Sequence, residues 1–203
     1  MTDSSSGPDR PNQSGWHWRR GEPGPTLRAE RKGVDAMKAV VVYESHWGNT
    51  AEIARAVADG IGPEAQVLTT EEALPEAIAG ADLLVVGAPV IAFGLPSPRA
   101  EDVVAATAAE APVPPEMIHP SMFWWLAELP EGSGQAAAFE THIRWSPGGA
   151  TGAIERGLAK KGYHLTADAG KFVVKGRYGP LREGELERAK EWGSGLRPRF
   201  GQR

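Results

Sequence analysis

"KAVVVYESHWGNTAEIARAVADGI", residues 38–61, joins a β-branched apolar run to a segment with helical spacing. The run at 38–44 shows no alternation of apolar and polar residues, which is typical of a central parallel strand covered on both faces. In the second half, the apolar residues that fall on one helical face are Ile53, Val57 and Ile61. The stretch therefore predicts a buried strand that passes directly into an amphipathic helix.

The turn between this strand and this helix, residues 45–50, holds hydroxyl, amide and glycine residues but no lysine or arginine. Asn49 is the predicted N-cap of the helix, with Glu52 as its capping-box partner. A helix N-terminus offers unpaired N–H groups and a partial positive charge, so it favours an anion. Gly48 permits close backbone approach, and the side chains that can add hydrogen bonds are Ser45, Asn49 and Thr50.

Apolar runs and helical segments alternate along the rest of the chain. Further strands are predicted at 65–69, 81–89 and 134–141, with 163–166 and 171–176 as two pieces of a fifth strand. Helices are predicted at 71–80, 121–129, 150–162 and 182–196, the last with its acidic residues on a solvated face, and 107–120 is predicted to be a loop. This alternation predicts an α/β fold: a doubly wound five-stranded parallel sheet of strand order 2-1-3-4-5. Its switch point, where ligands bind, lies beside the first strand and hence at residues 45–50.

The chain has 203 residues, a net charge of −4 and no cysteine. Without cysteine, disulfides, thiolate metal sites, iron–sulfur clusters and cysteine nucleophiles are excluded. Residues 1–36 hold six basic and five acidic residues, so residues 37–203 carry −5. This charge argues against nucleic acid as the main partner. The longest apolar run, 83–96, is too short to span a bilayer, and no signal-peptide core precedes it, so we expect a cytoplasmic protein without a membrane span.

The N-terminal segment, residues 1–36, is rich in Ser, Gly, Pro and Arg and has no periodicity. Such a composition predicts a disordered leader, because too little apolar surface is available to offset the entropy of ordering. WHWRR at 16–20 leaves open a contact with nucleic acid or membrane. Met37 is an alternative start, since the codons of residues 32–34 can read as a ribosome-binding sequence.

The sequence excludes two nucleotide-binding classes and the receiver domains. A P-loop needs G-x-x-x-x-G-K-[ST], and a dinucleotide fingerprint needs G-x-G-x-x-G; the turn contains neither. A receiver domain needs an aspartate at the end of the third strand, where this chain has Gly87-Ala88-Pro89. What is left is a turn that holds an anion by neutral donors.

Residues 37–203 resemble the flavodoxin family, whose phosphate loop, [ST]-x-T-G-x-T, lies between the first strand and the first helix. Ser45, Gly48, Asn49 and Thr50 match this motif, His46 fills its variable position, and Trp47 replaces its first threonine. The resemblance implies that the loop binds the phosphate of FMN without countercharges. The indole N–H of Trp47 can replace the missing hydroxyl as a donor, or its ring can cover the ribityl chain.

The resemblance also implies that the flavin ring lies between the loops after the third and fourth strands. In the first of these loops, the candidate residues are Pro89, Val90, Ile91, Ala92, Phe93 and Gly94; in the second they are Thr141, His142 and Trp145. Either Phe93 or Trp145 is expected beside the ring. His142 is either a hydrogen-bond donor to a flavin carbonyl or a solvated loop histidine. The histidines are too scattered to predict a metal site.

The function that this resemblance implies is FMN-dependent electron transfer with a redox partner protein or a small redox substrate. The alternative is an FMN-dependent oxidoreductase on the same fold, acting on a quinone or a protoporphyrinogen-type substrate. The acidic charge of residues 37–203 favours a basic partner. Arg144 and Arg177, in the loops after the fourth and fifth strands, are the cations that can approach the flavin. The pattern leaves the oligomeric state open.

Overall fold

The computed structural model describes residues 37–197. The predicted disordered leader at 1–36, with its aromatic-basic segment at 16–20, lies outside the described residues. Residues 198–203 lie outside them as well.

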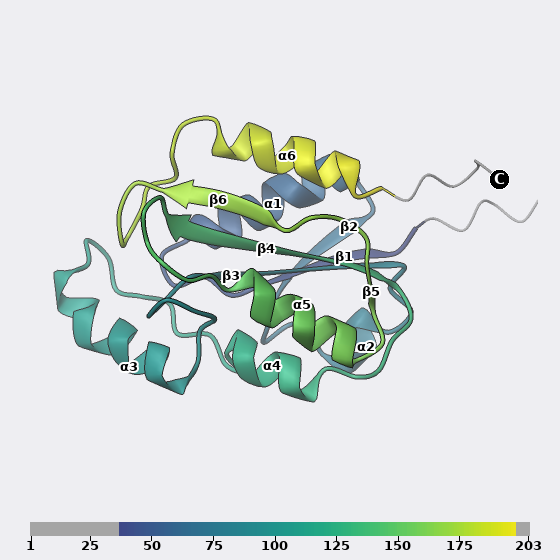
Figure 1. Ribbon diagram of the computed structural model, residues 1–203, viewed down its shortest axis with the longest axis horizontal. Coiled ribbons are helices and arrows are strands. Elements are labelled where there is room, and N and C mark those ends of the chain that lie inside the picture. The colour runs from purple at the N-terminus through teal and green to yellow at the C-terminus, as the bar shows by residue number, and fades with distance from the viewer. Residues whose placement is uncertain (1–36, 198–203) are drawn as a thin grey trace, which may run out of the picture. The chain divides into compact units, whose positions relative to one another are not determined.

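A parallel sheet forms the centre of the molecule (Figure 1). Its strands are β1 (Ala39–Tyr43), β2 (Ala65–Thr69), β3 (Leu83–Pro89), β4 (Gln135–Ile143), β5 (His164–Leu165) and β6 (Gly170–Val174). The strand order is β2-β1-β3-β4-β5, and β6 also pairs with β4. β5 pairs with the start of β4 and β6 with its end, so the two are pieces of one fifth strand. The predicted order 2-1-3-4-5 is confirmed.

Helices cover both faces of the sheet. They are α1 (Asn49–Ile61), α2 (Pro75–Ile78), α3 (Pro98–Thr107), the 3-10 turn η1 (Ala108–Glu110), α4 (Met122–Glu128), α5 (Thr151–Lys160) and α6 (Glu185–Gly195). In Figure 1, α1 and α6 lie on one face, and α2, α4 and α5 lie on the other. Each group of helices packs against its own apolar core, so the sheet is doubly wound as predicted.

Successive side chains of each central strand point to opposite faces of the sheet and so contribute to both apolar cores. Val40 and Val42 of β1 pack under α2 and α4, whereas Val41 and Tyr43 pack under α1 and α6. All five residues of β1 are buried. A strand buried on both faces has no need of polar residues, which explains the continuous apolar run in the sequence.

α3 lies at residues for which no helix or strand was predicted, and three local predictions are corrected by the structure. α2 has four residues where the pattern predicted ten. The N-cap of α1 is Gly48 and not Asn49, because Gly48 adopts a left-handed conformation (φ 84°) that starts the helix one residue earlier. Glu185 of α6, predicted on a solvated face, is fully buried; it accepts the N–H of Val173 and pairs with Arg182.

Gly87 of β3 lies directly against the ring of Phe139, its register partner on β4. A β-carbon on Gly87 would overlap this ring, and Phe139 is itself fixed by edge-to-face contacts with Phe172 and Trp192. We therefore expect Gly87→Ala to lower the free energy of unfolding by about 1–3 kcal/mol or more, measured by urea denaturation. Gly195→Ala, which meets no atom within 4 Å, is the control. Equal stability of the two variants would contradict this packing.

Candidate functional site

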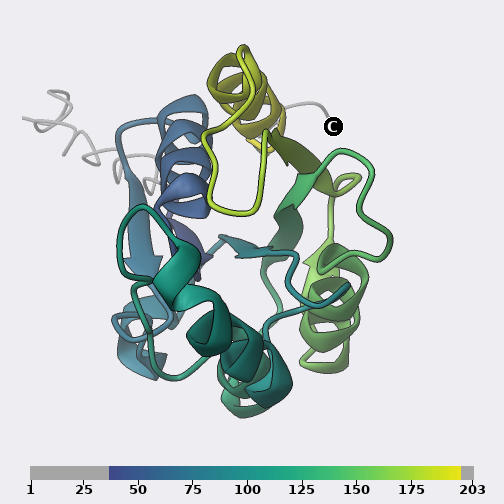
Figure 2. The same cartoon turned by 90° about the vertical axis from the view of Figure 1, so that its left-hand side faces the viewer.

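The carboxyl ends of the parallel strands meet at one edge of the sheet, on the left of Figure 1. Figure 2 views the molecule toward this edge, with α3 below and the loop after β6 above. A cavity of about 390 Å³ opens among the loops after β1, β3, β4 and β6 and the side of α3. Its lining residues are Ser45, His46, Trp47, Asn49, Thr50, Pro89, Val90, Ile91, Ala92, Phe93, Val103, Val104, Thr107, Thr141, His142, Ile143, Ser146, Val174 and Arg177.

The turn from β1 into α1 is rich in hydrogen-bond donors. Within the part of the chain that the structure describes, the backbone N–H groups of residues 46–51 have no protein acceptor. The Ser45 hydroxyl and the Trp47 indole N–H are buried, and neither has a hydrogen-bond partner among the described residues. Buried polar groups in proteins are nearly always paired, so a turn with this many free donors fits a bound anion.

Two other helices at this edge begin differently. Met122, the first residue of α4, donates its N–H to the buried carboxylate of Glu44 (N···O 2.7 Å). Ala150 and Thr151, at the start of α5, donate theirs to the buried carboxylate of Glu140 (2.7 and 2.9 Å). These two helices carry a protein anion at their N-termini, whereas no carboxylate of the described residues accepts from the first turn of α1. The start of α1 therefore offers N–H groups, unpaired among the described residues, that an anion could accept.

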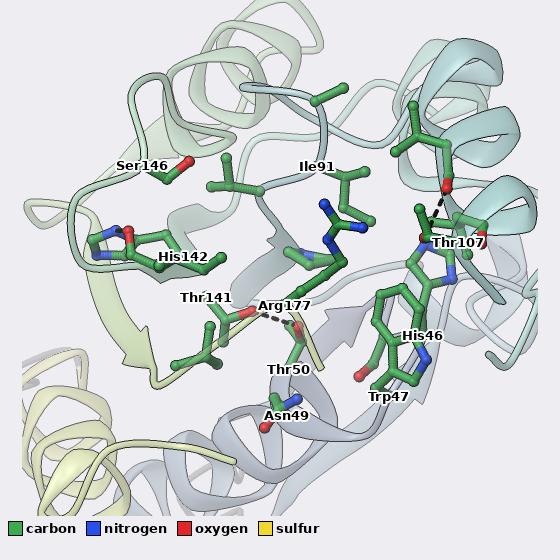
Figure 3. Close-up of a pocket in the computed structure, with 18 of the residues that line it drawn as sticks. His46, Trp47, Asn49, Thr50, Ile91, Thr107, Thr141, His142, Ser146 and Arg177 are labelled. Carbon is green, nitrogen blue, oxygen red and sulfur yellow. Dashed lines mark hydrogen bonds between the residues drawn. The ribbon is translucent and has the colours of Figure 1, made fainter. Parts of the chain in front are cut away.

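Two hydroxyls meet at the floor of the cavity. Thr50 Oγ1 of α1 and Thr141 Oγ1 of β4 lie 2.8 Å apart, and both residues are buried (Figure 3). One hydroxyl donates to the other, so the second hydrogen is free to be donated to a ligand. Both threonines were predicted as site residues, from separate loops.

His46 is buried in the same turn. Its Nδ1 lies 2.8 Å from the carbonyl oxygen of Glu116, and its Nε2 lies 3.3 Å from Oε1 of Glu44. Burial lowers the pKa of His46, but the carboxylate of Glu44 close to Nε2 and the hydrogen bond to the Glu116 carbonyl raise it by more. The pKa of His46 is therefore above the ordinary histidine value.

The loop after β6 closes the cavity against α3. The Tyr178 hydroxyl donates to the carbonyl of Thr107 (3.1 Å), and the Tyr178 ring packs edge-on against Trp47 with centroids 5.0 Å apart. Asn49 donates its side-chain amide to the carbonyl of Tyr178, which is what its side chain does in place of capping α1. Arg177 pairs with Glu110 (3.6 Å) and lines the cavity, so the site contains a cation. In Figure 3 its guanidinium lies in the middle of the view, with His142 to the left and His46 to the right.

The loop after β3 holds a strained two-residue turn. Ile91 and Gly94 exchange backbone hydrogen bonds of 3.0 Å, and the two residues between them, Ala92 and Phe93, have φ of 47° and 70°. Left-handed conformations at non-glycine residues are costly and cluster at functional sites. The carbonyl of Phe93 accepts the N–H of Gly149 (3.2 Å), which ties this turn to the loop after β4. The Phe93 side chain is 65% exposed at the cavity rim.

The structure gathers most of the predicted site residues around this cavity, and the exceptions are Gly48, Gly94 and Trp145. Gly48 and Gly94 belong to turns, and other residues of these turns line the cavity. The Trp145 side chain is 84% exposed and packs against the Arg144 guanidinium, 5.0 Å from its ring centroid. His142 lines the cavity, with its Nδ1 near the carbonyl of Ile143 (3.2 Å).

Sequence reasoning missed part of the cavity lining. The residues it did not name are Val103, Val104, Thr107, Ile143, Ser146 and Val174. The first three come from α3, which was not predicted. Ile143 and Ser146 are chain neighbours of the predicted residues His142 and Trp145, so naming the whole segment after the fourth predicted strand would have found them. Arg177 was named as a cation near the ligand but not as a site residue.

No group of His, Asp and Glu among residues 37–197 has the arrangement of a metal site. Within the same residues, no helix is long and apolar enough to cross a membrane.

No family model matches this chain, and no curated protein sequence matches it. Solved structures do. A flavodoxin from the domain Archaea is 22% identical with a TM-score of 0.55, and the match covers 79% of this chain and 96% of that one. Oxidised Flavodoxin 2 from Bacillus cereus is 18% identical with a TM-score of 0.54 (77% and 94% covered). A WrbA-like protein from Agrobacterium tumefaciens is 19% identical with a TM-score of 0.50 (79% and 95% covered). The described chain therefore has the flavodoxin-like fold.

Proposed function

We propose that residues 37–203 form a cytoplasmic FMN-binding domain that transfers electrons, and that residues 1–36 are dispensable for this activity. The observation that carries the proposal is the donor-rich turn after β1. Its N–H groups at 46–51, the buried hydroxyl of Ser45 and the buried indole N–H of Trp47 lack acceptors among the described residues. A phosphate monoester supplies acceptor oxygens for such a set of donors.

The cavity beyond the turn suits the rest of FMN. Thr50 and Thr141 offer a hydroxyl where the turn meets the cavity, and the ring would lie between the loops at 89–94 and 141–145. The walls there are mostly apolar, which suits a flat heterocycle. FMN supplies the redox chemistry when it is bound. The chain's own residues bind the phosphate, fix the ring position and keep water from its buried side.

The size of the cavity favours a carrier over an enzyme. A volume of about 390 Å³ is near the lower end of the range for small-molecule sites. It suits one cofactor better than a cofactor with a quinone or protoporphyrinogen-type substrate above it. The rim is apolar and open, with Phe93 and Val103 exposed. An exposed rim of this kind suits transient contact with a redox partner protein, and the charge of −5 on residues 37–203 favours a basic one.

If the turn binds the phosphate of FMN, Ser45→Ala should weaken FMN and leave riboflavin unaffected. A hydrogen bond to a charged group contributes about 1.5–3 kcal/mol, so the Kd for FMN should rise roughly 10- to 150-fold. The free energy of unfolding should stay the same or rise, because the lost hydroxyl has no protein partner. Fluorescence titration of protein freed of flavin measures both affinities. Ser133→Ala, at the opposite edge of the sheet, is the control, and equal losses for FMN and riboflavin would contradict phosphate recognition.

If the protein is a carrier, it should show little turnover by itself. Mixed anaerobically with NADPH and a soluble quinone, FMN-loaded protein should reduce the quinone no faster than free FMN at the same concentration. The reason is that a cavity of about 390 Å³ suits one cofactor better than a cofactor together with a quinone. Initial rates at increasing quinone concentration test this. Fast, saturable quinone reduction would favour the oxidoreductase.

A further inference from the structure

Both ring nitrogens of His46 face oxygen atoms of the protein. Nδ1 lies 2.8 Å from the Glu116 carbonyl oxygen, and Nε2 lies 3.3 Å from Glu44 Oε1. The side chains of His46 and Glu44 are 1% and 0% exposed, so water does not reach this pair. A carbonyl oxygen accepts only, which places a proton on Nδ1.

A proton shared by Nε2 and Glu44 can be on either group. The contact of the second Glu44 oxygen favours the state with the proton on Nε2. This oxygen accepts the N–H of Met122 at the start of α4 (2.7 Å), a contact that stabilises the carboxylate. With the carboxylate ionised, Nε2 must carry a proton, because a neutral nitrogen would face a negative oxygen. His46 is then an imidazolium cation whose Nδ1–H donates to the Glu116 carbonyl and whose Nε2 side is in ion-pair contact with Glu44.

This cation joins three segments of the site. Glu44 continues β1, His46 belongs to the donor-rich turn, and Glu116 belongs to the connection between η1 and α4. The N–H of Glu116 also donates to the carbonyl of His46 (2.8 Å), so ring and backbone both fasten the turn to this connection. The other charged groups near His46 are Glu101 of α3, whose charge also raises its pKa, and Arg177, which lines the same cavity.

We propose that His46 is a doubly protonated positioning residue of the phosphate-binding turn, and that phosphate-dependent FMN binding weakens as His46 loses its proton. For the identity of the ligand, this proposal rests on the proposed function. The claim that His46 is doubly protonated does not depend on any ligand. The turn would thus hold a phosphate beside a buried cation, although the sequence pattern predicted neutral donors only.

The direction of the pH effect follows from the raised pKa of His46. Stabilisation by the imidazolium is complete below the ordinary histidine pKa of about 6.5, and it is lost as pH rises through the higher value in the folded protein. Phosphate monoesters themselves gain charge above about pH 6, which acts in the opposite direction. A variant without His46 separates the two effects.

The first test uses the native chain without added flavin, labelled with ¹⁵N-histidine. NMR spectra of the ring nitrogens at pH 7 should show both nitrogens of His46 protonated, with the signal assigned from its backbone. A deprotonated Nε2 would overturn the proposal. This result is independent of FMN.

The second test measures Kd for FMN and for riboflavin between pH 6 and pH 9 in the native protein, in His46→Gln and in His164→Gln. Between pH 6 and pH 9 the Kd for FMN should rise about tenfold more in the native protein than in His46→Gln. A tenfold difference corresponds to a change of about one unit in the pKa of His46 when FMN binds. Riboflavin should show no such difference. His164, exposed on β5, is the control and should behave as the native protein does.

Parallel pH profiles of the native protein and His46→Gln would overturn the coupling. If FMN fails to bind at every pH, the proposed function is wrong and the coupling falls with it, whereas the ring-nitrogen spectra still decide the protonation of His46. If His46→Gln does not fold, Glu44→Gln removes the same ion pair and takes its place.

Discussion

The position of β1 constrains the rest of the structure. This strand pairs with β2 on one edge and with β3 on the other, and helices cover both of its faces. The chain can therefore leave it only at the carboxyl end of the sheet, where the register also brings the ends of β3 and β4. The result is that Thr50 and Thr141, 91 residues apart, place their hydroxyls 2.8 Å from each other. The position of the cavity therefore depends more on the strand register than on any single side chain.

Most of this fold could be predicted because the decisive elements are apolar and long enough to show a period. The strands at 39–43 and 83–89 are continuous apolar runs, and α1 carries its buried residues on one face. α3 lacked such a signal: Ala100 and Val104 are the residues that it buries, and its other side is exposed or lines the cavity. A helix that borders a ligand site instead of the core has little amphipathic pattern to detect.

Part of the candidate site could likewise be predicted from the sequence, and part could not. The turn at 45–50 could be predicted because its spacing follows from local chemistry, a glycine and hydroxyls at a helix start. The contacts that fix it could not, because they join residues far apart in sequence: His46 with Glu116, Asn49 with Tyr178, and Tyr178 with Thr107. Asn49 illustrates the difference. Its side chain has the chemistry of an N-cap, but Gly48 takes that position and the amide donates to the loop after β6.

The buried carboxylates show why the turn after β1 is different from its neighbours. Glu44 directly follows β1, Glu140 lies within β4, and they accept N–H groups at the start of α4 and α5. Each also faces a cation, His46 at 3.3 Å and Lys171 at 3.7 Å. A buried charge is tolerated only when it is paired and hydrogen-bonded, so these glutamates and helix starts satisfy one another. The described residues provide no such carboxylate for α1. The protein thus neutralises these two helix starts with its own carboxylates and leaves the donors at the start of α1 and the buried donors around Ser45 without an acceptor among the described residues. Under the proposed function, the phosphate of FMN is that acceptor.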